Sequence, residues 1–301
     1  MKNFLWGNLA LFLLLACNSV KAPDTMHRLK KELLTKIAAF PEATVAVAYK
    51  NLSTGAVLLI HEKEIMHAAS TMKVPVMIEV FKQAENSHFS LKDSLLVKNE
   101  FKSIMDDSHY SMDIDEDSDE SIYPLIGKKM SVLDLTFQMI TVSSNLATNI
   151  LIDLVGAENV MTTLKEIGAN EMQVLRGVED IKAYRAGKNN VTTAYDLMLV
   201  MEAVAAPKVV SLEAGKQMLQ ILKAQKFNDK IPALLPPQVE VAHKTGWITK
   251  IDHDAAIVYP EIAPPFILVV LTKGIADRKQ SNRLISEISR MIFYDHLQSH
   301  S

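Results

Sequence analysis

The sequence has a single cysteine, Cys17, among its 301 residues. A lone cysteine excludes an internal disulfide. The chain also has no excess of positive charge, because its formal net charge is −3, and it has no basic block. Aromatic and basic residues are not interleaved either, so the electrostatic footprint of a nucleic-acid-binding protein is absent. The sequence has no internal repeat.

The chain also lacks an apolar run long enough to cross a membrane. After Lys2, residues 4–16 are apolar, but a spanning helix needs about 20 residues. This pattern predicts a secretory signal rather than an anchor helix. Residues 14–17 resemble the bacterial lipoprotein cleavage box, so we expect residues 1–16 to be removed by cleavage before Cys17. We then expect Cys17 to be lipidated and the exported lipoprotein to be anchored to a membrane, facing the periplasm. The alternative is an incidental cysteine in a signal peptide that is removed whole.

Three short polar motifs carry the chemistry of the remaining chain. The first places Ser70 and Lys73 at the start of a helix predicted over residues 74–85. Residues three apart share one helical face, so the amine can reach the hydroxyl. The positive end of the helix dipole favours an alkoxide and the oxyanion formed after attack. Serine and lysine at this spacing also occur by chance.

The second motif is the triplet Ser143, Ser144 and Asn145, which interrupts an apolar helical pattern. A polar interruption of this kind predicts a turn between two core helices, with Ser143 and Asn145 facing a cleft. An ordinary helix cap at Ser143 or Ser144 is the plainer interpretation.

The third motif is Lys244, Thr245 and Gly246, placed after a short apolar alternation typical of a strand. Glycine in a strand marks a close backbone approach, which we attribute to a substrate, and Lys244 with Thr245 can hold a carboxylate. A solvated edge-strand lysine is the alternative. Together, the three motifs predict a serine hydrolase that attacks an amide.

With these motifs, residues 25–298 resemble the class A β-lactamases, in the wider group of penicillin-recognising serine enzymes. The stretches 71–77, 139–152 and 243–259 extend the likeness. The resemblance implies a serine hydrolase acting on a cyclic amide, with Ser70 as nucleophile and Lys73 beside it. It also implies that Ser143 carries a proton to the leaving nitrogen.

The resemblance further implies how a substrate is held. Asn145 would contact the acyl amide, and Lys244 with Thr245 would bind the carboxylate beside Gly246. The backbone amides of Ser70 and Trp247 would form the oxyanion hole. The family usually has Asp where this chain has Ser144, which changes a buried hydrogen-bonding partner and no reacting group.

The carboxylate that activates the deacylating water lies on a loop that opens with Arg, an aromatic residue and Glu in the family. Here Arg176 is followed by Gly, Val178 and Glu179, one position late. Counting from Ser143 favours Glu179, and counting from Arg176 favours Val178. We predict Glu179 as general base, with Asp180 in reserve; both could instead be solvated loop acids. Without a carboxylate at the water, acylation would persist while hydrolysis stalls.

The hydrophobic pattern predicts an α/β protein of the α+β type. We expect a five-stranded antiparallel sheet flanked by N- and C-terminal helices, with an inserted all-helical lobe and the cleft between them. The sheet domain would comprise residues 25–65 and 223–299, and the helical domain residues 66–222. The expected elements are helices 25–39, 194–205, 212–222 and 280–296, and strands 43–49, 56–60, 239–243, 255–259 and 266–272.

Residues 106–120 carry eight acids. We expect a solvated segment that disfavours anionic β-lactams. A calcium loop fits poorly, because Ser118 and Pro124 replace the glycine and glutamate of an EF-hand. His61 and His67 are six apart and do not match the zinc motif, so we expect no metal and no cofactor.

Three functions remain open: a β-lactamase working through a Ser70 acyl-enzyme, a peptidoglycan-directed DD-peptidase-like or penicillin-binding hydrolase with slow deacylation, and a lipid-anchored non-catalytic binding protein. The expected partner is a β-lactam or a peptidoglycan-stem-like small molecule, and we expect a monomer.

Overall fold

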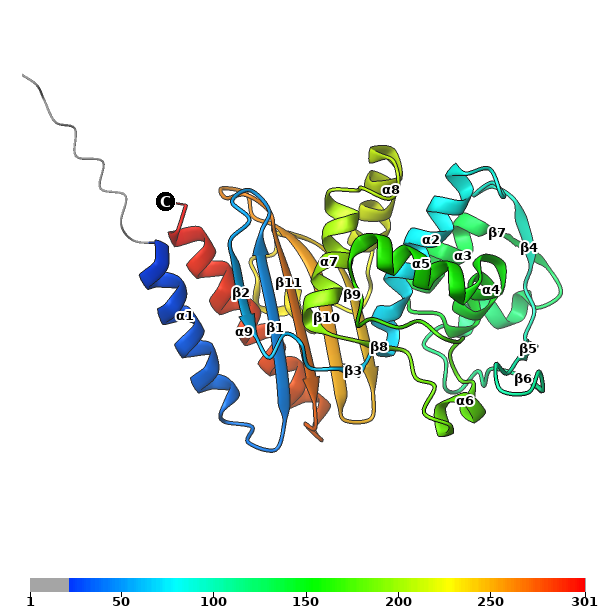
Figure 1. The fold of residues 1–301 in the computed structure, drawn as a ribbon, viewed down its shortest axis with the longest axis horizontal. Helices are drawn as coiled ribbons and strands as arrows, with labels where there is room; N and C mark the ends of the chain where they lie inside the picture. The colour runs from blue at the N-terminus through cyan, green and yellow to red at the C-terminus, as the bar shows by residue number, and fades with distance from the viewer. Residues whose placement is uncertain (1–21, 301) are drawn as a thin grey trace, which may run out of the picture.

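The computed structural model of the protein describes residues 22–300, with side chains from Met26 onward, and has the expected α+β architecture (Figure 1). Within this range, five strands form one antiparallel sheet in the order β2-β1-β11-β10-β9. Their bounds are β1 Thr44–Asn51, β2 Val57–Ile60, β9 Glu240–Ile248, β10 Ile251–Tyr259 and β11 Phe266–Lys273. The predicted fold class is confirmed.

The two faces of the sheet are covered by different helices. Val45 and Val47 belong to a core with α1 (Ala22–Ile37) and α9 (Arg278–Gln298), whereas Ala46 and Ala48 belong to the larger core of the other face. This alternation follows from the two-residue period of a strand. On the second face, α7 (Ala194–Ala205) packs against β1, β10 and β11. The sheet is therefore buried on both sides, which explains its nearly continuous apolar strands.

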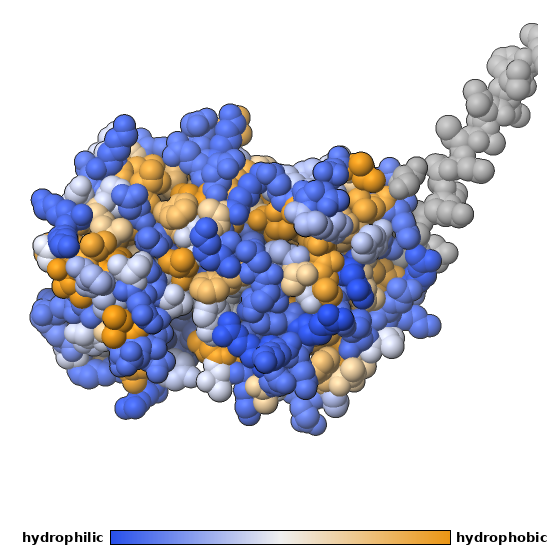
Figure 2. All heavy atoms as spheres, turned by 180° about the vertical axis from the view of Figure 1, so that it is seen from behind, coloured by the Kyte–Doolittle hydropathy of each residue, from blue (hydrophilic) through white to orange (hydrophobic). Residues whose placement is uncertain are grey.

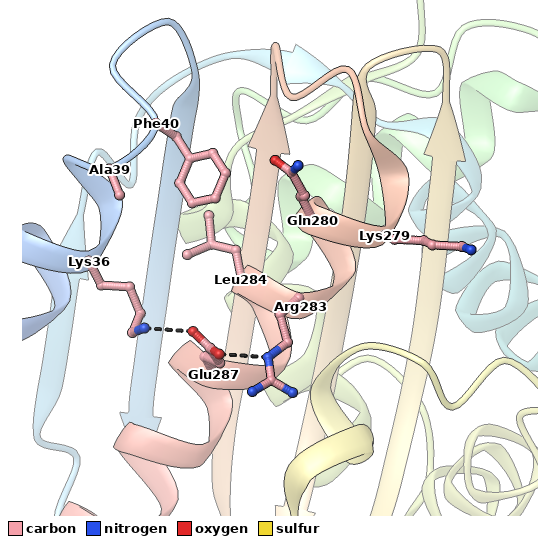
Figure 3. Close-up of a pocket in the computed structure, with 8 residues that line it drawn as sticks. All are labelled: Lys36, Ala39, Phe40, Lys279, Gln280, Arg283, Leu284 and Glu287. Carbon is pink, nitrogen blue, oxygen red and sulfur yellow. Dashed lines mark hydrogen bonds and ion pairs between the residues drawn. The ribbon is translucent and has the colours of Figure 1, made fainter.

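The seam between α1 and α9 is closed by charges at its surface (Figure 3). Lys36 Nζ lies 2.6 Å from one carboxylate oxygen of Glu287, and Arg283 Nε lies 2.6 Å from the other. A hollow of about 520 Å³ beside this pair is lined by Phe40 and Leu284 together with polar side chains.

The helical layer lies on the far side of the sheet from α1 and α9 (Figure 1). Its helices are η1 Ala69–Met72, α2 Lys73–Glu85, η2 Glu120–Leu125, α3 Val132–Thr141, α4 Asn145–Val155, α5 Ala157–Ile167, α6 Ile181–Arg185 and α8 Leu212–Lys223, and η3 Ile231–Leu234 lies beside β10. Three small strand pairs, which the pattern did not predict, are β3 Met66–His67 with β8 Val191–Thr192, β4 Ser94–Leu96 with β7 Lys129–Ser131, and β5 Phe101–Lys102 with β6 His109–Tyr110. The division into two domains stays a prediction.

The surface seen in Figure 2 is mostly hydrophilic with scattered hydrophobic residues. Among residues 22–300, no helix combines the length and the apolar character that a membrane span requires. Cys17 and the predicted cleavage site lie outside the described residues.

Candidate active site

A pocket of about 850 Å³ is lined by residues from six segments of the sequence. These segments are residues 67–70, the acidic stretch 111–118, the first residue of α4, residues 176–184 up to and within α6, Asn190, and residues 247–249 at the end of β9. Ser70, Asn145, Glu179 and Trp247 all line this pocket. The first two motifs therefore contribute to one pocket, and so does Trp247, which directly follows the third motif.

Ser70 is half-buried in η1, one turn before α2. The preceding residue, Ala69, has a φ of +46°, a left-handed conformation that costs energy for a residue with a Cβ. The Ala69 backbone N–H donates to His67 Nδ1 at 3.0 Å, which helps to fix this turn. The backbone is thus held in a strained conformation directly at the serine.

Gly246 explains how β9 approaches this turn so closely. A Cβ on Gly246 would lie 2.9 Å from the Ser70 nitrogen and 3.0 Å from the Thr71 nitrogen. The predicted occupant of this space is a substrate, but the structure shows that the η1 backbone itself occupies it. The contact brings the Ser70 amide against the strand segment that leads to Trp247, where the oxyanion hole is predicted.

Lys73 is fully buried beneath the pocket. Its Nζ donates to the Ser143 carbonyl oxygen at 2.6 Å, to Asn145 Oδ1 at 2.8 Å and to Ser143 Oγ at 3.3 Å. Burial lowers the pKa of Lys73 from 10.5 to about 7, against the opposing charges of Asp117 and Glu179. A substantial fraction of this amine is therefore neutral near pH 7 and able to accept a proton.

Ser143 occupies the predicted turn between α3 and α4, with a φ of +60°. Its Oγ lies 3.3 Å from Lys73 Nζ and 3.0 Å from Lys244 Nζ, so one hydroxyl connects two amines. Burial and then the nearby charge of Lys73 hold the pKa of Lys244 well below its usual range. Ser144 caps α4 by accepting the Ala147 N–H at 3.3 Å, so the plainer interpretation of the triplet also holds for that residue.

Glu179 lines the pocket and is hydrogen-bonded to Asn145. Asn145 Nδ2 donates to Glu179 Oε1 at 3.0 Å, while Asn145 Oδ1 accepts from Lys73. The backbone N–H of Asp113 lies 3.4 Å from the other Glu179 oxygen. Burial raises the pKa of Glu179 above its ordinary value, against these hydrogen bonds. One amide side chain therefore links the candidate base of acylation to the candidate base of deacylation.

The two competing positions next to Glu179 have other contacts. The Asp180 carboxylate accepts from Ser103 Oγ at 2.8 Å, from the Ile104 N–H at 3.0 Å and from the Ala183 N–H at 3.0 Å, as the cap of α6. Val178 lines the pocket, and its backbone is held by the Asn149 side chain at 2.7 and 3.0 Å.

A second group of buried polar atoms lies at the end of β9, where the predicted Thr245 is joined by Lys230, which the sequence did not indicate. The Thr245 hydroxyl and Lys230 Nζ are buried, and neither has a hydrogen-bond partner among residues 22–300. Lys230 lies 3.6 Å from Asp252, and Arg278 stacks 4.2 Å from the Trp247 ring centroid. Positive charge therefore gathers beside Trp247, although no local pattern around Lys230 indicated it.

The acidic segment requires a correction. The run of acids predicts a solvated segment over residues 106–120, but Asp117 is only 8% exposed and Asp119 only 5%. Both are engaged in turns and helix termini, whereas Asp113, Asp115 and Glu116 are exposed as expected. Within residues 22–300, no three side chains of the metal-ligating types come together as a candidate metal site.

The sequence pattern of the β-lactamase enzyme family matches residues 28–297. The chain belongs to this family. Among its curated relatives, a β-lactamase of Citrobacter koseri is 24% identical over 267 residues, covering 85% of this chain and 86% of that protein. The β-lactamase AST-1 of Nocardia asteroides is 28% identical over 173 residues, 54% of either chain. The predicted class A β-lactamase-like family is confirmed.

Solved structures of the family share the fold. A variant of PBP-A in acyl-enzyme complex with penicillin G has a TM-score of 0.77 at 23% identity, covering 90% of this chain and 97% of that chain. A variant of the class A β-lactamase of the last common ancestor of Gram-negative bacteria has a TM-score of 0.78 at 20% identity, covering 91% and 100%. At this identity the likeness establishes the fold, and the roles of individual residues stay predictions.

Proposed function

We propose that this protein is a serine β-lactamase that opens the lactam amide of penicillins and cephalosporins through an acyl-enzyme on Ser70. The observation that carries the proposal is the position of Ser143 Oγ, within 3.3 Å of Lys73 Nζ and 3.0 Å of Lys244 Nζ. A hydroxyl between two buried amines can pass a proton at low cost, which an acyl transfer from an amide requires at its leaving nitrogen.

Acylation begins with attack of Ser70 Oγ on the lactam carbonyl carbon. Neutral Lys73 takes the hydroxyl proton, directly or with Glu179 through water; which of them acts is disputed even among relatives. The N–H groups of Ser70 and Trp247 stabilise the oxyanion. The carbon–nitrogen bond then breaks, and Ser143 donates a proton to the nitrogen and recovers one from the amines. The products of this step are a Ser70 ester and a ring-opened amine.

Deacylation reverses these roles with water as nucleophile. Glu179 removes a proton from a water molecule, the hydroxide attacks the ester carbonyl, and the bond to Ser70 Oγ breaks with return of the proton to the serine. The carboxylate is suited to this step because its raised pKa makes it a stronger base than an ordinary glutamate. Lys244 and Thr245 hold the substrate carboxylate during both steps, with Gly246 permitting the approach of the strand.

The full chain purified in detergent and mixed with a chromogenic cephalosporin tests this proposal, with Ser70→Ala as the control. Sustained turnover that Ser70→Ala abolishes is the expected result. If there is no turnover and benzylpenicillin adds no mass to Ser70, acyl chemistry is contradicted and a non-catalytic binding protein remains.

A penicillin-binding or DD-peptidase-like hydrolase with slow deacylation is the second candidate. The observation that favours it is Val178, an apolar side chain in the pocket directly before Glu179. PBP-A, a relative in fold, was trapped as an acyl-enzyme with penicillin G in a variant form. A single burst of one equivalent with a long-lived ester on Ser70 would favour this function over the first.

For location, we propose that the protein is exported and anchored to a membrane through a lipid on Cys17, facing the periplasm. The support is the apolar run of residues 4–16 followed by the cleavage-box pattern. Labelling cells with an alkynyl fatty acid should mark the protein, and Cys17→Ala should remove both the label and the membrane association. A labelled Cys17→Ala variant would exclude this anchor.

A further inference from the structure

Asp117, in the acidic segment, directly contacts the start of α4, where the turn from α3 ends. The Asp117 carboxylate accepts the Asn145 N–H at 2.8 Å and the Leu146 N–H at 2.9 Å. These amides open α4, and first-turn amides have no partner within their own helix. A carboxylate that accepts two of them forms charge-assisted bonds at the positive end of the helix dipole.

The same carboxylate is held rigidly from its own side. Tyr123 OH donates to Asp117 Oδ2 at 3.1 Å, and the Asp119 N–H donates to Oδ1 at 3.2 Å. The next residue, Ser118, donates its hydroxyl to the Ser143 carbonyl oxygen at 3.2 Å, the atom that also accepts from Lys73. The acidic segment therefore holds the turn at Ser143, Asn145 and Leu146.

These contacts matter because the same turn supplies the carbonyl, hydroxyl and amide oxygens that accept hydrogen bonds from Lys73. The Asn145 side chain accepts a hydrogen bond from Lys73, and the Asn145 backbone N–H donates to Asp117. A single residue therefore connects the Asp117 carboxylate to the Lys73 amine. Three charged groups face Lys73: Asp117 from this segment, Glu179 from the loop before α6 and Lys244 from β9. Of the two acids, Asp117 acts more strongly on Lys73.

Resting on the function proposed above, we infer that Asp117 is a positioning residue for acylation. It fixes the turn that carries Ser143 and Asn145, and its negative charge sets how readily Lys73 gives up its proton. No other member of the acidic segment combines these contacts among the described residues.

The pH dependence of the acylation rate constant tests this role. In the unaltered chain, the rate should rise with pH through about 7 as Lys73 loses its proton. Asp117→Asn keeps the shape but removes the charge, so the rise should move to lower pH by about one unit. The rate on the plateau should fall about tenfold, because a charged acceptor is lost. Asp117→Glu should keep the rise near its original pH.

Asp115→Asn is the matched control, because it removes the same charge from an exposed position of the same segment outside the pocket lining. Its profile should match that of the unaltered chain. A loss of rate in Asp117→Asn at every pH, with the rise unmoved, would reduce Asp117 to a purely structural role. An equal shift in Asp115→Asn would assign the effect to the net charge of the segment.

A measurement without substrate separates this inference from the proposed function. In protein labelled with ε-carbon-13 lysine, the Lys73 signal, assigned by its loss in Lys73→Met, should titrate at lower pH in Asp117→Asn than in the unaltered chain. If no β-lactam acylates the protein but this shift is found, the inference stands and the proposed function falls. If acylation occurs and Lys73 titrates at the same pH in both proteins, the inference is wrong.

Discussion

The seam between α1 and α9 and the turn around Ser143 both hold lysines, but in opposite ways. At the seam, Lys36 remains 33% exposed and lies 2.6 Å from the Glu287 carboxylate. At the turn, Lys73 and Lys244 are fully buried and donate to hydroxyl, amide and carbonyl oxygens. A neutral acceptor does not compensate a buried ammonium as a carboxylate does.

The difference separates a partly exposed ion pair from buried amines at the candidate active site. The ion pair at the seam is partly exposed and contributes little to stability, because solvent screens it. Lysine at the turn is destabilised in its charged form, which makes it a base near neutral pH. Burial of these amines costs stability at the turn, and the two apolar cores offset that cost.

Replacing Glu179 should have the largest effect of the changes considered, and it tests the buried amines and their neighbours at the candidate active site. In Glu179→Gln, hydrolysis of the Ser70 ester should slow by about 10²- to 10⁴-fold, the usual contribution of a general base, while the ester still forms. Mass spectrometry of the protein during benzylpenicillin turnover measures both steps.

Glu120→Gln, an exposed acid outside the pocket lining, serves as control for this change. Turnover by Glu179→Gln within threefold of the unaltered chain would contradict its role as base. The Asp180 carboxylate already accepts hydrogen bonds from three donors. A group other than Glu179 and Asp180 would then have to activate the deacylating water.

Gly246→Ala tests the same region by adding one methyl group against the backbone of Ser70, the candidate nucleophile. The new Cβ would lie 2.9 Å from the Ser70 nitrogen, so either η1 or β9 must shift. Acylation should fall by about 10²- to 10³-fold, as when an oxyanion-hole donor is lost. Stopped-flow measurement of the acylation rate checks this expectation, and unchanged kinetics would show that the backbone at Ser70 does not need its present position.

The sequence predicted the sheet well because its signals are local. Strands such as β11 are continuous apolar runs, and the turn at Ser143 interrupts a clear helical period. The predicted strand 239–243 was too short: β9 continues through Lys244 and Gly246. Polar side chains of a functional strand hide its period, although hydrogen bonding to β10 continues.

The candidate site was only partly predictable, because its remaining parts depend on contacts between distant segments. Asp117 looks like its exposed neighbours in the sequence, and only the fold brings it to the first turn of α4. Lys230 likewise carries no local signal, yet it is buried beside Trp247. Motif spacing therefore predicted the candidate reacting groups, but it did not indicate the buried contacts of Asp117 or Lys230.

The pH dependence of stability tests the cost of the buried amine. Lys73 has a pKa of about 7 in the folded chain and 10.5 as its ordinary value, so the unfolded chain binds more protons between these limits. The free energy of unfolding should therefore rise with pH in this window, with a slope of up to about 1.4 kcal/mol per pH unit from this group. In Lys73→Met this slope should be lost, which urea denaturation at pH 7 to 10 measures. An equal slope in both proteins would show that Lys73 is not destabilised by burial.

Lys36→Ala should have the smallest effect and tests the stable side of the comparison. Removing the partner of Glu287 should lower the free energy of unfolding by less than about 1 kcal/mol, because the pair is partly exposed and Arg283 still contacts the carboxylate. Acylation should be unchanged, since the seam lies across the sheet from the pocket. Urea denaturation at low and at high salt measures the change, with Lys279→Ala as control because Figure 3 shows Lys279 pointing away from Glu287. A loss several times larger in Lys36→Ala than in the control, unaffected by salt, would mean that this pair behaves like the buried amines after all.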